Sequence, residues 1–100
     1  MAGGFRGPWI GGAPAVSVVT SANVPVTVFP AGSIMNGGDI VNPSNAPATL
    51  YVDVCAPASV GAVTSLPLLP GQPFHLPGPF ASDVTVVSTV AGHSFNAVKY

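Results

Sequence analysis

The chain has 100 residues, and only five of them carry a charge: Arg6, Asp39, Asp53, Asp83 and Lys99. Soluble domains have about 25% charged residues, which keep their surfaces hydrated and apart, so a chain with 5% is better suited to a surface that partners cover. Two basic residues and a net charge of −1 argue against direct binding of nucleic acid, because phosphate backbones attract strongly positive surfaces.

The remaining composition restricts the class of protein further. Mean hydropathy is +0.58, yet the longest apolar runs, 66–70 and 84–87, are far shorter than the roughly 18 residues of a membrane span. One cysteine, Cys55, excludes an intrachain disulfide and a cysteine-rich zinc site, and we expect it to be a small buried or half-buried hydrophobe without a role. No secretory signal pattern is visible, which predicts assembly inside a cell.

Residues 1–14 are rich in glycine and proline around three large apolar side chains. Such a segment cannot form a core of its own. One interpretation is a flexible tail, as glycine-rich linkers are. The interpretation that we favour is an extended arm that lies across a neighbouring subunit, because aromatic anchors commonly attach such arms. The candidate protein-interaction residues are then Phe5, Arg6, Trp9 and Ile10.

From residue 15 onward the sequence alternates with period two and is rich in β-branched residues, with proline, glycine and asparagine at short intervals. This pattern is typical of short antiparallel strands in a sandwich or barrel. No long helical period is present, and twelve prolines disfavour long helices. We therefore predict an all-β domain over 15–100, a single jelly-roll-like or immunoglobulin-like sandwich of about eight strands: 15–20, 24–29, 38–42, 48–54, 63–69, 72–76, 83–90 and 94–99.

Individual residues refine this prediction. Pro25, Pro67 and Pro73 each remove a backbone donor, so their strands are expected at sheet edges or at bulges. Asn36–Gly38 and Pro70–Gly71 are expected to be tight turns.

The strand at 48–54 predicts two distinct faces, because successive side chains point to opposite sides. In this strand, Leu50, Val52 and Val54 are assigned to one face, and Tyr51, Asp53 and Cys55 to the other.

Elsewhere in the chain, Phe74, Leu76 and Phe80 are expected in the core and at its corners.

The sequence contains few candidates for a catalytic or metal-binding site. His75 and His93 are candidates to pair with Asp39, Asp53 or Asp83, but their spacings match no metal or acid–base motif. We expect both histidines to be ordinary surface or turn groups. No nucleophile elbow or phosphate-binding loop accompanies the serine, histidine and aspartate residues, so we predict that the chain is not an enzyme and has no cofactor, catalytic residue or metal site.

Residues from about 23 to 100 resemble a group of small virion proteins of tailed bacteriophages. These proteins have a strand ending in V-T-V-F, a second strand around I-x-N, a Leu-Tyr-Val strand, a P-G turn, an aromatic strand ending in L-P and a closing pair of strands. The pieces that carry the resemblance here are Val26–Phe29, Asp39–Asn45, Ala48–Val52, Leu69–Pro77, Val84–Ser88 and Gly92–Val98. Extra prolines and scarce charge depart from the usual pattern.

This resemblance implies a β-sandwich that decorates or cements a capsid, or belongs to a tail or fibre. The function expected is a structural virion protein, assembled in the host cytoplasm, that binds the major capsid protein on the capsid surface. We expect a homo-oligomer, trimer or dimer, without membrane contact. The alternative is a tail, fibre or vertex adaptor or host-recognition module, for which aromatic side chains in the loops 43–48 and 56–65 would be expected. Those loops contain none.

Overall fold

The computed structural model describes residues 12–34 and 36–100. The candidate anchors Phe5, Arg6, Trp9 and Ile10 lie outside the described residues. The described part of the chain is all-β with nine short strands and contains no helix. The strands are β1 (Val18–Val19), β2 (Val26–Phe29), β3 (Gly38–Val41), β4 (Leu50–Asp53), β5 (Leu66–Leu68), β6 (Pro73–Leu76), β7 (Val84–Ser88), β8 (His93–Ser94) and β9 (Asn96–Lys99).

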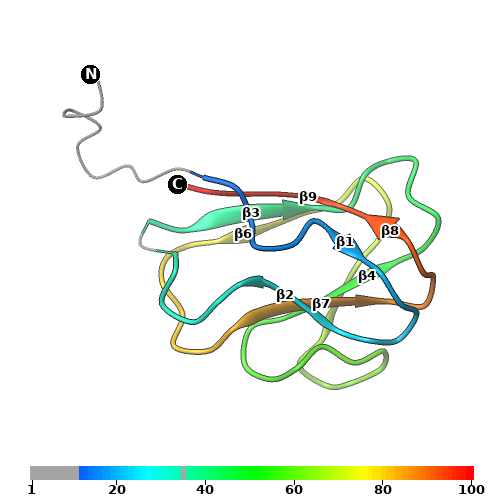
Figure 1. Cartoon of the computed structure of the whole chain (residues 1–100), viewed down its shortest axis with the longest axis horizontal. Coiled ribbons are helices and arrows are strands. Elements are labelled where there is room, and N and C mark those ends of the chain that lie inside the picture. The colour runs from blue at the N-terminus through cyan, green and yellow to red at the C-terminus, as the bar shows by residue number, and fades with distance from the viewer. Residues whose placement is uncertain (1–11, 35) are drawn as a thin grey trace.

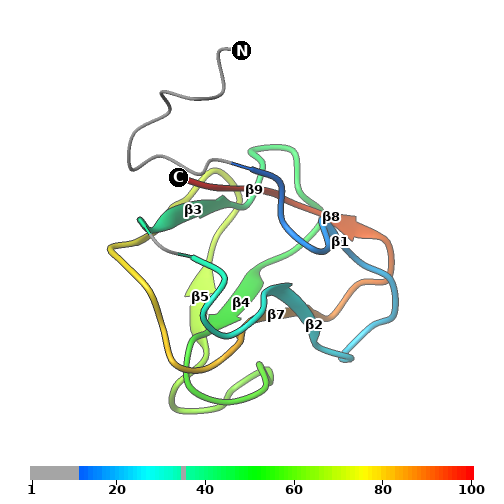
Figure 2. The same ribbon diagram turned by 60° about the vertical axis from the view of Figure 1, so that its left-hand side comes forward.

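Two sheets form the layers of the domain. One has four strands in the order β2-β7-β4-β5, and the other has three in the order β6-β3-β9; β1 pairs with β8 in a short ribbon. All described pairings are antiparallel. Figure 1 shows the three-stranded sheet lying over the four-stranded one, and Figure 2 shows the two layers from a second direction. The predicted all-β antiparallel fold is confirmed.

The core lies between the sheets and takes side chains from both. Ile40 and Leu76 enter from the three-stranded sheet, while Leu50, Val52 and Val86 enter from the other, all at most 1% exposed. The face assignment of 48–54 is correct, since Val54 also packs against this cluster. Phe74, Leu76 and Phe80 belong to the core or pack against it, as expected.

The predicted final strand, 94–99, is split into β8 and β9 at Phe95. Phe95 is 3% exposed and belongs to the core cluster, and at this point the strand changes its partner from β1 to β3. The N-terminal segment follows it in the opposite direction: the Phe95 amide donates to the Ser17 carbonyl, and Gly12 and Lys99 exchange two backbone hydrogen bonds of 2.9 and 3.0 Å. The strand near the C-terminus is therefore covered by residues 12–19 of the same chain.

Gly37 allows the backbone just before β3 to pack closely against β6. Its φ is +92°, and an added Cβ would lie 2.2 Å from the carbonyl oxygen of Leu76. Both the left-handed conformation and the lack of space require glycine here.

Candidate functional site

His93 is at the centre of a buried polar network that sequence reasoning missed. Its Nδ1 lies 2.7 Å from the Oγ of Ser88 in β7, and its Nε2 lies 2.8 Å from the Oδ1 of Asn42, the residue after β3. All three side chains are 0% exposed. The prediction that His93 is a surface or turn group is therefore wrong, because β8 turns it between the sheets.

The hydrogen-bond directions in this network follow from Asn42. Its amide nitrogen donates to the carbonyls of Ala48 and Leu68, at 3.0 and 2.8 Å, so its Oδ1 must accept from Nε2–H of His93. Nδ1 then accepts from the Ser88 hydroxyl, which in turn accepts from the Val90 amide at 3.1 Å. Every polar atom of the neutral ring is satisfied, and burial lowers the pKa of His93 below its ordinary value.

A serine, a histidine and an amide in a chain resemble the groups of a hydrolase triad, but access decides against catalysis. With Ser88 and His93 both fully buried, no substrate can reach the hydroxyl. In addition, the acceptor of the serine proton is Nδ1 and the orienting group is on Nε2, the reverse of the chymotrypsin arrangement. The network instead joins β7, β8 and the segment after β3.

Asp53 organises a second buried polar cluster, on the outer face of the four-stranded sheet. Its Oδ1 accepts from the backbone amides of Cys55 and Ala56, both at 2.9 Å. Its Oδ2 accepts from the hydroxyls of Thr64 and Ser65, at 2.6 and 2.8 Å. Burial acts to raise the pKa of this carboxyl, but the hydrogen bonds, that from Thr64 foremost, outweigh it and hold the pKa far below the ordinary value of 3.8.

The cluster fastens the segment 54–65 over its sheet. Thr85, which pairs with Asp53 across β4 and β7, accepts from the Ala58 amide at 2.9 Å and donates to the Ala56 carbonyl at 3.2 Å. Asp53 is thereby 1% exposed and Thr85 7% exposed, although both point away from the core. Asp53 is a structural anchor for this segment, a role that its position in the sequence did not indicate.

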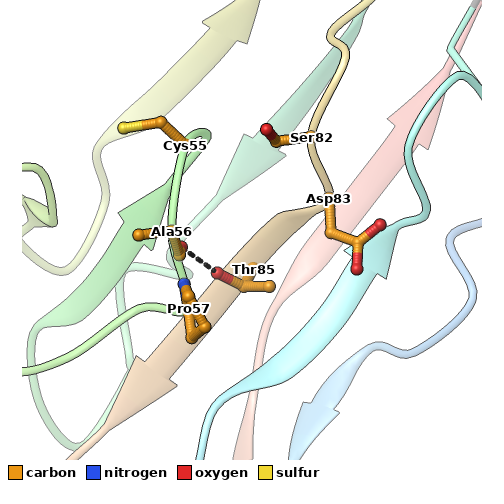
Figure 3. Close-up of a pocket in the computed structure, with 6 residues that line it drawn as sticks. All are labelled: Cys55, Ala56, Pro57, Ser82, Asp83 and Thr85. Carbon is orange, nitrogen blue, oxygen red and sulfur yellow. Dashed lines mark hydrogen bonds between the residues drawn. The ribbon is translucent and has the colours of Figure 1, made fainter.

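A pocket of about 160 Å³ lies beside this segment (Figure 3), lined by Cys55, Ala56, Pro57, Ser82, Asp83 and Thr85. Cys55 is exposed, so the expectation of a buried or half-buried residue is wrong: the turn that gives its amide to Asp53 places the thiol outside. Figure 3 shows its sulfur and the Asp83 carboxylate pointing away from each other. Asp83 accepts from the Ala31 amide at 2.7 Å. The pocket has a free thiol but no base positioned to activate it.

The outer face of the three-stranded sheet has a small surface cluster. Asp39 in β3 pairs with Nδ1 of His75 in β6 at 2.8 Å and accepts from the hydroxyl of Tyr100. Of the pairings considered from sequence, this is the one that the described residues form between a histidine and an aspartate. His75 is exposed, as expected. Next to Asp39 is an open hollow of about 120 Å³, lined also by Val41, Asn96, Ala97 and Val98.

The described surface also exposes large apolar side chains. Val63 is 98% exposed, Leu69 54% and Leu66 48%. With Val60 they occupy the stretch 60–69, which includes β5 and the residues on either side of it. We refer to these four exposed residues as the β5 apolar residues: Val60, Val63, Leu66 and Leu69. Val24, Val90 and Val98 are exposed elsewhere.

Comparison with known protein families, curated proteins and solved structures found no match. Within residues 12–34 and 36–100, no group of three or more His, Cys, Asp or Glu side chains is arranged to hold a metal ion. The same residues include no helix long and apolar enough to cross a membrane.

Proposed function

We propose that this chain is a structural, non-enzymatic subunit of a larger protein assembly, and specifically a decoration or cement protein on the outside of a bacteriophage capsid. The observation that carries the proposal is a surface with exposed apolar side chains and very few charged ones. The resemblance of residues 23–100 to phage virion proteins indicates which assembly this is. The partner of this chain is then the major capsid protein.

The surface has even less charge than the composition alone indicates, because Asp53 is buried. Asp39 is paired with His75 and accepts a hydrogen bond from Tyr100, which leaves Asp83, hydrogen-bonded to the Ala31 amide, as the exposed aspartate. A surface with so few charges costs little to desolvate when a partner covers it.

We assign the contact with the shell protein to the β5 apolar residues, which are exposed along the stretch 60–69. Complete burial of a valine or leucine side chain stabilises by about 1.5–3 kcal/mol, so four partly exposed side chains support a modest contact per copy. Repetition of this contact over a shell adds its effect by multivalency. Asp53 holds the adjoining segment 54–65 in place, so the surface loses little conformational entropy on binding.

Side chains, more than strand edges, are expected to make this contact. The outer edge of β9 is occupied by residues 12–17 of the same chain. Edge strands β5 and β6 contain Pro67 and Pro73, each without a backbone donor. The edges at β5, β6 and β9 therefore offer little for strand addition by another protein.

The test is the copy number of the chain in purified phage particles, by quantitative mass spectrometry against the shell protein. A ratio near one copy per shell subunit supports the cement role. A ratio smaller by one or two orders of magnitude indicates the alternative, a tail, fibre or vertex part. Absence from particles would overturn the virion proposal. Val63→Asp is expected to reduce occupancy. The control is the same substitution at another exposed valine, Val24→Asp, which lies outside the β5 apolar residues and is expected to leave occupancy unchanged.

A further inference from the structure

The outer faces of the two sheets differ in what covers them. The segment 54–65 covers the four-stranded sheet near Asp53 and Thr85, and both are buried. On the three-stranded sheet the outward positions Val98, His75 and Asn96 remain exposed. We refer to this outward surface of β6, β3 and β9, with its hollow beside Asp39, as the open face.

Gly12, the first described residue, lies beside the C-terminal end of β9, at one edge of this open face. Gly12 is held against Lys99 by two backbone hydrogen bonds, and residues 12–17 run antiparallel to β9. From residue 17 to residue 12 this segment therefore runs toward the Tyr100 end of β9, away from the hollow, which lies alongside Asn96–Val98. Eleven residues are attached at this point, among them Phe5, Trp9 and Ile10.

We propose that residues 1–11 of one copy bind the open face of a second copy, with Trp9 as the anchor in the hollow lined by Val41, Ala97 and Val98. The hollow has an apolar floor with Asp39 and Asn96 as polar neighbours. Tryptophan suits such a site, because its ring is apolar and its single N–H needs an acceptor. This inference rests on the proposed function as a subunit of an assembly and on the sequence-based expectation that residues 1–14 contact a neighbouring subunit, and it adds the surface that receives them.

Direction and area both favour a second copy over the arm's own chain. To reach its own hollow, the arm would have to reverse direction just before Gly12. A two-fold pair lets each arm continue away from its own sheet toward the partner's sheet. Two exchanged arms bring four aromatic side chains, each of which buries about 150–250 Å². With the surface that they cover, this approaches the roughly 1,200–2,000 Å² of specific interfaces.

The experiment uses intrinsic fluorescence, because Trp9 is the only tryptophan of the chain. The emission maximum of the full chain should move to shorter wavelength as protein concentration rises, with the same midpoint as dimer formation in sedimentation equilibrium. Val98→Asp, on the open face, should abolish both the shift and the dimer. Trp9→Ala, which changes no side chain of the described core, should abolish the dimer and serves as a second variant if Val98→Asp fails to fold.

The matched control is Val63→Asp, in the β5 apolar residues. It should leave the fluorescence shift and the dimer unchanged even where it reduces binding to particles, so failure of arm docking and failure of the capsid role are distinguishable. A shifted emission that does not depend on concentration would mean docking on the arm's own chain and would overturn the proposal. So would an unshifted emission at every concentration, or a dimer that persists in both Val98→Asp and Trp9→Ala.

Discussion

His93 donates its Nε2–H to the Oδ1 of Asn42 across 2.8 Å, and these two residues are 51 positions apart in the sequence. Because the Asn42 amide nitrogen is committed to two carbonyls, the histidine is held as one neutral tautomer. A second proton on the ring would have to displace the hydrogen bond that Nδ1 accepts from Ser88. The network thus couples the stability of the fold to pH.

Stability should fall as pH decreases below about 6.5. The folded-state pKa of His93 is lower than its ordinary value of 6.5, so between these two values the unfolded chain binds more protons than the folded one, and acid favours unfolding. Urea unfolding at pH 7 and pH 5 measures the effect. His93→Gln should lose this part of the pH dependence, whereas His75→Gln, at the exposed histidine, should keep it. An identical slope in His93→Gln and the native chain would contradict the assignment.

Asn42→Ala should destabilise the fold by roughly 2–4 kcal/mol, because the change leaves the carbonyls of Ala48 and Leu68 and the Nε2–H of His93 without partners. Chemical denaturation at pH 7 measures the free energy of unfolding. Asn45→Ala, at an exposed position of the same loop, is the control and should change it by less than about 0.5 kcal/mol. A small effect at Asn42 would mean that water replaces the side chain.

Asp53→Asn should loosen the segment 54–65 and cost roughly 1.5–3 kcal/mol, since an amide cannot accept the four hydrogen bonds of the carboxylate. Limited proteolysis should then cut within 55–65. The folded-state pKa of Asp53 lies far below 3.8, so its contribution is complete above pH 3.8 and is lost only as pH falls through that lower value. Asp83→Asn is the matched control, and equal effects of the two changes would argue against the anchoring role of Asp53.

The thiol of Cys55 should react fully with Ellman's reagent in the native protein, because the side chain is exposed. The rate should change little when denaturant is added. Cys55→Ser should abolish the reaction and leave the thermal midpoint unchanged. Reaction only after unfolding would show that the thiol is buried.

Gly37→Ala should destabilise much more than Gly61→Ala. Both glycines have positive φ, +92° and +84°, which costs a residue with Cβ about 1–2 kcal/mol, but only at Gly37 does the added Cβ meet a backbone oxygen. Thermal unfolding of the two variants separates strain from steric conflict. Equal midpoints would show that the turn at residue 37 can shift.

The sequence by itself determined the fold class, the approximate positions of most strands and three of the edge strands. Pro25, Pro67 and Pro73 predicted edges or bulges, and β2, β5 and β6 all lie at sheet edges. Alternation in 48–54 predicted which face enters the core. These predictions succeeded because backbone donors and side-chain alternation are local properties of the chain.

Only the tertiary structure decided which polar side chains are buried and which are exposed. Two histidines that looked alike in sequence differ completely, with His75 exposed beside Asp39 and His93 buried against Ser88 and Asn42. Asp53 became a buried anchor while Cys55, two residues later, was turned outward. The physical reason is that burial of a polar group depends on whether distant segments supply its hydrogen-bond partners, and that pairing arises only when the sheets are assembled.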